Sequence, residues 1–124
     1  MIFKARLAPL NSLVLVMDRG TGEIPGSMGK TLVAATPSCV AIGTRSSTDG
    51  DTEIVFTDEK AYPLSDSGFF MAFTGTIAIP RKRVDVCTAD LRVVAGLPRS
   101  ATECRVAVWT NDRKEPSRIC IVVE

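Results

Sequence analysis

Residues 103–123 read ECRVAVWTNDRKEPSRICIVV, and this stretch indicates the fold class of the chain. Two runs within it, VAVW at 106–109 and ICIVV at 119–123, are rich in β-branched and aromatic residues, and a polar segment that ends at Pro116 separates them. Such side chains favour β-strands because they pack well on a pleated, half-buried surface. The stretch therefore predicts two short strands, near 103–110 and 117–123.

The same pattern recurs along the whole chain. We expect further strands near 2–7, 12–17, 30–35, 38–44, 52–58, 68–79, 83–88 and 91–95. Gly, Pro, Asp and Asn, which are typical of turns, lie between these runs. This spacing predicts an all-β fold: a single antiparallel β-sandwich of about eight to ten short strands, with little or no helix. A chain of 124 residues has the usual length of one domain, so we expect a single β-sandwich domain over 1–124.

The alternation of side chains assigns faces to the strands, since successive residues of a strand point to opposite sides of the sheet. Ile54 and Phe56 share one face, and Val55 lies on the other. In the run at 119–123 both faces are largely apolar, which is typical of a central or covered strand. Trp109, the only tryptophan, is either a core residue or the anchor of an interface.

A hairpin is expected around Thr48-Asp49-Gly50-Asp51, between the strands near 38–44 and 52–58. The Asp-Gly pair favours this turn because it tolerates the positive φ angles of a two-residue type I′ connection.

The bulk charge argues against several classes of partner. The formal net charge is only +1, whereas a nucleic-acid binder usually carries a clear basic excess, so a nucleic-acid partner is not expected. The one tight basic run, Arg81-Lys82-Arg83, is interpreted as a solvated turn, with a phosphate-contacting patch as the alternative. No apolar run approaches the roughly 20 residues of a membrane span, and no secretory signal is recognisable. We therefore expect a cytoplasmic protein that does not contact membranes.

The residue types needed for common catalytic sites are missing. The chain has no histidine, which removes the commonest general base and the usual ligands of catalytic zinc. Its four cysteines are widely separated and form no Cys-x-x-Cys pair, so we interpret them as small buried apolar residues, with disulfides as the alternative. Gly29-Lys30-Thr31 resembles the end of a phosphate-binding loop, but Ile24 stands where that motif needs its first glycine. We expect no cofactor, no metal and no enzyme activity.

Carboxylates are the remaining candidates for a functional site, because residues 49–66 are acidic apart from Lys60. One interpretation is an acidic surface that binds a partner protein, since such a surface competes for a basic cleft and speeds association. A calcium or magnesium site is a second interpretation, although the spacing does not match an EF-hand loop. The third is a hairpin that its charges keep soluble. The candidate partner-binding residues are Asp49, Asp51, Glu53, Asp58, Glu59 and Asp66.

The order of elements in the second half resembles that of a known family. It runs through TIAIP at 76–80, RVDV at 83–86, RVVAGLP at 92–98, CRVAVWT at 104–110 and the closing strand at 117–123. This order resembles the ComJ competence-protein family, small bacterial proteins that inhibit a partner nuclease. The family usually carries a Trp-Thr-Asp element in its first half, where this chain has the glycine-rich loop at 20–30. No inhibitory residue is therefore carried over to this chain.

Three functions are consistent with these features. The first is a non-catalytic protein-binding module, as an inhibitor or immunity-type partner of a nuclease or toxin, which the resemblance implies and the acidic residues allow. The second is a structural or assembly domain that forms a homodimer or larger homo-oligomer through a strand edge. The third is a small carboxylate- or metal-dependent enzyme.

Overall fold

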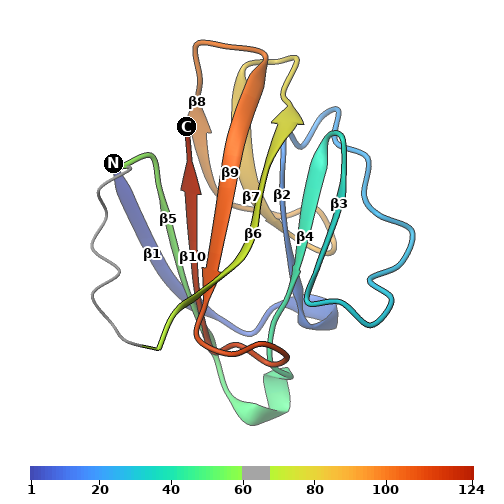
Figure 1. Cartoon of the computed structure of the whole chain (residues 1–124), viewed down its shortest axis with the longest axis vertical. Helices are drawn as coiled ribbons and strands as arrows, with labels where there is room; N and C mark the ends of the chain where they lie inside the picture. The colour runs from blue at the N-terminus through green and yellow to red at the C-terminus, as the bar shows by residue number, and fades with distance from the viewer. Residues whose placement is uncertain (60–67) are drawn as a thin grey trace.

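The structure is a computed structural model that describes residues 1–59 and 68–124. This described part forms ten strands and two short 3-10 helices, and it contains no α-helix (Figure 1). The expected all-β fold is therefore confirmed, and most strands begin and end close to their predicted positions. The strands are β1 (Ile2–Leu7), β2 (Leu13–Met17), β3 (Val33–Thr36), β4 (Cys39–Gly43), β5 (Thr52–Thr57), β6 (Phe70–Ala78), β7 (Arg83–Thr88), β8 (Val93–Pro98), β9 (Glu103–Thr110) and β10 (Arg118–Val123), and the 3-10 helices are η1 (Leu10–Ser12) and η2 (Ser47–Asp49).

The strands form two five-stranded sheets that pack face to face. Sheet A has the order β1-β5-β10-β9-β6, and sheet B has the order β3-β4-β2-β7-β8. Neighbouring strands pair in antiparallel fashion, as expected, except β5 and β10, which are parallel. A parallel pair needs a long crossover connection, and the chain from β6 to β9 supplies it. We expected antiparallel pairing throughout, and the pair of β5 and β10 is the exception.

The prediction of a hairpin around Asp49-Gly50 is wrong, because β4 and β5 belong to different sheets. Both edges of β4 are already paired, with β2 and β3, so β5 cannot join it. Residues 44–51 instead cross from sheet B to sheet A through η2, where Ser46 Oγ accepts a hydrogen bond from the Thr48 amide at 3.3 Å. Gly50 does have a positive φ of 118°, but its ψ of −179° is that of an extended residue rather than a type I′ turn.

The hydrophobic core lies between the two sheets and is built by alternate residues of every central strand. As predicted, Ile54 and Phe56 share one face of the strand and Val55 lies on the other; the shared face points into this core, and Val55 lies on the outer face of sheet A. β10 occupies the centre of sheet A, and its two faces are both buried: Ile121 faces the core and Cys120 faces outward.

Each sheet also buries part of its outer face. On sheet B, Leu15, Met17 and Cys87 pack with Met28 from the connection between β2 and β3. On sheet A, the half-buried Trp109 packs in a cluster with its neighbours on the outer face. Trp109 therefore lies outside the core between the sheets.

Within the part of the chain that the structure describes, no helix has the length and apolar character needed to cross a membrane.

Candidate binding surfaces

The predicted carboxylates are spread over two ends of the molecule. Asp49 belongs to η2 and Asp51 follows it, and both side chains are exposed. Asp58 and Glu59 follow the opposite end of β5, about 20 Å away at the usual rise of about 3.3 Å per strand residue. Asp66 lies outside the described residues.

Cations neutralise most of these carboxylates. The Glu53 carboxylate lies between Arg6 and Arg118, at 3.9 and 3.6 Å. Asp58 accepts a hydrogen bond of 2.7 Å from the Met1 amino group, which lowers the pKa of Asp58, and it lies 3.5 Å from Arg99.

Glu59 lies 3.5 Å from the same amino group. Among residues 1–59 and 68–124, Asp49 and Asp51 are the two predicted carboxylates without an ion-pair partner. They therefore carry the acidic character that is open to a partner.

The four cysteines are free and buried. Burial raises the pKa of Cys39 to about 12 and the pKa values of Cys87 and Cys120 to about 11, because a thiolate is poorly solvated inside the protein. It also raises the pKa of Cys104. These neutral thiols lack the thiolate character of a catalytic nucleophile.

Residues 29–31 do not form a phosphate-binding loop. The short strand β3 begins at Val33, where a phosphate-binding loop would require the amino terminus of a helix. In addition, no group of three or more His, Cys, Asp or Glu side chains is placed to hold a metal ion among the described residues.

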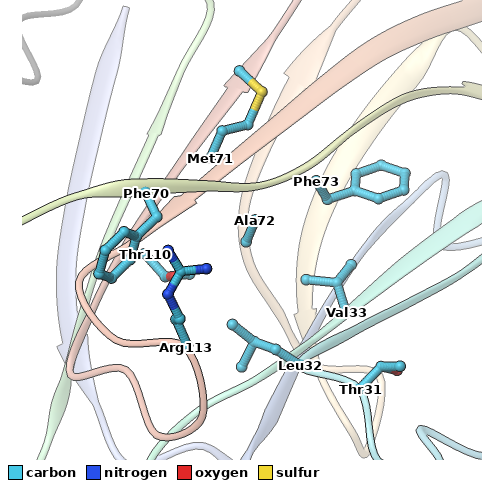
Figure 2. Close-up of a pocket in the computed structure, with 9 residues that line it drawn as sticks. All are labelled: Thr31, Leu32, Val33, Phe70, Met71, Ala72, Phe73, Thr110 and Arg113. Atoms are coloured by element: carbon cyan, nitrogen blue, oxygen red, sulfur yellow. The ribbon is translucent and has the colours of Figure 1, made fainter.

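An apolar groove of about 360 Å³ lies at the open side of the sandwich, where the edge strands β6 and β3 face each other. Figure 2 shows Phe73 and Ala72 of β6 on one side and Leu32 and Val33 on the other. Arg113, from the connection between β9 and β10, lies at the opposite end of the groove from Phe73. Its guanidinium carbon is 4.5 Å from the centre of the Phe70 ring, a favourable cation–π contact.

The strand β6 presents an unusual edge to solvent. Its nine residues, FMAFTGTIA, contain neither a charge nor a proline, although edge strands usually carry such residues to prevent pairing with other chains. Phe70 and Met71 remain 37% and 50% exposed. A β-bulge between Met71 and Phe73 interrupts the pairing with β9. Neighbouring exposed apolar side chains such as these are typical of a surface that contacts another protein.

The sequence did not indicate the groove, because it depends on two strands that never pair. β3 and β6 lie in different sheets, and neither strand alone contains a motif. The run of aromatic and apolar residues at 69–73 is the available signal in the sequence, and by itself it predicts only a strand.

Of the basic run Arg81-Lys82-Arg83, the first two residues lie in the turn between β6 and β7, as expected, whereas Arg83 is the first residue of β7. Arg81 and Lys82 are exposed, but Arg83 is half-buried and makes an ion pair of 2.7 Å with the buried Asp85. The sequence did not predict this buried carboxylate or its partner.

The chain was compared with protein-family models, curated proteins and solved structures. No protein-family model matches the chain, and no curated protein matches its sequence. Among solved structures, the chain is similar to ComJ, inhibitor of the DNA degrading activity of NucA, from Bacillus subtilis. The TM-score is 0.67 at 10% identity, over 99% of this chain and 97% of that chain. This confirms the weak resemblance to the ComJ family at the level of the fold.

Proposed function

We propose that this chain is a non-catalytic protein-binding module that inhibits a nuclease or toxin, as an inhibitor or immunity-type partner. The observation that carries the proposal is the likeness to ComJ, which extends over nearly the full length of both chains. Free, unreactive thiols fit a non-catalytic role in the cytoplasm, where cysteines stay reduced.

The binding surface that we propose is the end of the sandwich that holds the apolar groove and the η2 connection with Asp49 and Asp51. The Arg45 amide donates a 3.1 Å hydrogen bond to the Pro116 carbonyl, so the η2 connection contacts the segment that carries Arg113. Exposed Phe70 and Met71 supply apolar area there, and interfaces are typically built around such aromatic anchors. Asp49 and Asp51 add negative charge, which speeds association with a basic cleft.

The test is an inhibition assay with purified nucleases and toxins from the organism that encodes this chain, beginning with any whose gene adjoins its own. We expect DNA degradation, or the corresponding toxic activity, to fall to its background level as this protein approaches an equimolar ratio. Unchanged activity at a large excess would contradict the proposal.

Variants then locate the surface. Phe70→Asp and the double variant Asp49→Asn/Asp51→Asn should each weaken inhibition by tenfold or more. Two controls match them in chemistry and lie outside the proposed surface: Ile24→Asp, an exposed apolar residue of the β2–β3 connection, and Glu23→Gln/Glu103→Gln, two exposed carboxylates. Equal effects of variants and controls would show that another surface binds the partner.

A second function, assembly with copies of itself, is favoured by the uncharged edge of β6. Two copies could pair this edge around a twofold axis without repulsion between like charges. Light scattering on the purified protein distinguishes these two functions. Assembly requires a dimer or a larger oligomer, whereas inhibition requires no self-association.

A further inference from the structure

A second, polar hollow of about 230 Å³ lies on the outer side of sheet B, away from the apolar groove. Arg19 and Gly20, directly after β2, form one wall, and Arg81 of the β6–β7 turn forms another. Arg83 and Asp85 of β7 contribute from the sheet, since Val84 and Val86 between and beside them point into the core.

Two buried carboxylates fix the main chain around this hollow. Asp18 is fully buried, and its two carboxylate oxygens accept hydrogen bonds from the amides of Arg81 at 2.9 Å and Gly20 at 3.3 Å. Asp85 is 2% exposed and accepts from the Arg19 amide at 3.3 Å. Burial of a carboxylate is costly unless it is hydrogen-bonded, and these bonds hold the segments that carry two of the arginines.

Two glycines leave the space that the charged side chains occupy. A methyl group added at Gly20 would overlap the Arg81 guanidinium. One added at Gly96, which pairs with Asp85 across the sheet, would overlap the Asp85 carboxylate and the Arg83 guanidinium. The backbone at Gly96 therefore leaves the room that the buried Asp85 carboxylate needs, and the backbone at Gly20 leaves room for the flexible end of Arg81.

All three guanidinium groups retain N–H donors for a ligand, and they differ in how many they already use. Arg83 is held by Asp85, to which it donates from Nε and from Nη2, the latter at 2.7 Å. Arg19 uses its Nε to donate to the Leu91 carbonyl at 2.6 Å, which leaves its terminal nitrogens. The Arg81 side chain has no acceptor among residues 1–59 and 68–124.

We propose that this hollow binds a single carboxylate group. The three arginines and two buried aspartates leave one net positive charge, which a monoanion neutralises and a phosphate dianion would exceed. A carboxylate also offers two coplanar oxygens that match the fork of a guanidinium group. A nucleic-acid backbone would need cations along a track of phosphates, whereas these are gathered at one point.

The test follows the amide and arginine Nε–H signals of the protein by NMR while sodium acetate is added, with sodium chloride replaced to keep the ionic strength constant. We expect saturable shifts at Gly20, Arg19 and Arg81. Arg81→Gln and Arg19→Gln should each weaken acetate binding about tenfold or more, the usual effect of losing a charge-assisted hydrogen bond. Arg105→Gln, an exposed arginine of β9, is the matched control and should leave it unchanged.

Two further ligands identify the source of the carboxylate. If the peptide acetyl-Gly-Glu-Gly-amide shifts the same signals and its Gln analogue does not, the site takes an acidic protein side chain. If acetate binds and the peptide does not, it takes a small free carboxylate. The proposal is overturned if acetate shifts do not saturate, if the Arg81→Gln and Arg19→Gln spectra are native but acetate binding is unchanged, or if inorganic phosphate at pH 8 binds more tightly than acetate. None of these results depends on whether the chain inhibits a nuclease.

Discussion

A single residue without a side chain, Gly96, allows a buried carboxylate and its arginine to lie against sheet B. Replacement by Ala would force the Asp85–Arg83 pair to move, because the new methyl group overlaps both side chains. We expect Gly96→Ala to lower the free energy of unfolding by about 1–3 kcal/mol, the usual cost of overpacking. Urea denaturation measures this change.

The control for this prediction is Gly26→Ala. Gly26 has open space around the position of an added methyl group, and its φ is not in the positive region. Its substitution should change the free energy of unfolding by less than about 0.5 kcal/mol. Equal effects at the two glycines would show that the ion pair moves aside without cost.

The cysteines give a second prediction at this scale. Their pKa values in the folded protein, raised to about 12 for Cys39 and about 11 for Cys87 and Cys120, keep the thiols neutral at pH 8. Ellman's reagent should therefore detect no fast-reacting thiol in the native protein and four after denaturation without reductant. Two or no thiols after denaturation would show disulfides and would contradict a cytoplasmic location.

The same pKa values set a pH dependence. As the pH rises above about 9, unfolded thiols lose protons while the folded thiols keep theirs. The cysteine contribution to stability is therefore complete below pH 9 and decreases as the pH approaches the folded pKa values. Substitution of Cys39 by Ala should reduce this alkaline slope in urea denaturation.

At the scale of elements, β6 is an edge strand without a charge or a proline, and we propose that it contacts the partner. We expect Thr74→Lys, which places a charge on the exposed side of this strand, to weaken nuclease inhibition at least tenfold, because a lysine on an edge opposes pairing and close contact. The fold should be retained, since Thr74 is exposed. Thr21→Lys, in the β2–β3 connection, is the control, and full inhibition by Thr74→Lys would exclude this edge from the interface.

The elements also show what the sequence can and cannot predict. The positions of the strands and the faces of residues such as Ile54 and Val55 follow from local patterns, because side-chain alternation is a property of the strand itself. The partition into sheets does not, since β5 pairs with β1 and β10 rather than with the preceding β4.

Both binding surfaces escape prediction for the same reason. The apolar groove lies between β3 and β6, which belong to different sheets and do not pair, so no local sequence pattern marks them as neighbours. The charge of the polar hollow depends on Asp18 and Asp85, which lie far apart in the chain and are brought together by the pairing of β2 with β7. The acidic run at 49–59 was visible in the sequence, but its neutralisation by Arg6, Arg118 and Arg99 was not.

At the scale of the whole molecule, we expect the two sheets to unfold together, as one domain. They share one core, to which both contribute fully buried side chains, so neither sheet can keep its inner face covered alone. Trp109 fluorescence, which reports on sheet A, and far-UV circular dichroism, which reports on both sheets, should give coincident urea transitions. Separate transitions would show two units.

The parallel pairing of β5 with β10 has a consequence for biosynthesis. β5 lies between β1 and β10 in sheet A, so its second edge stays open until the ribosome has released the last strand of the sheet. During translation, the apolar face of β5 and the inward residues of β9 remain without their central neighbour. Pairing between segments so distant in the chain also makes folding slow, because the loop between them must close before the contact forms. We therefore expect the nascent chain to be most prone to aggregation between the emergence of β5 and that of β10.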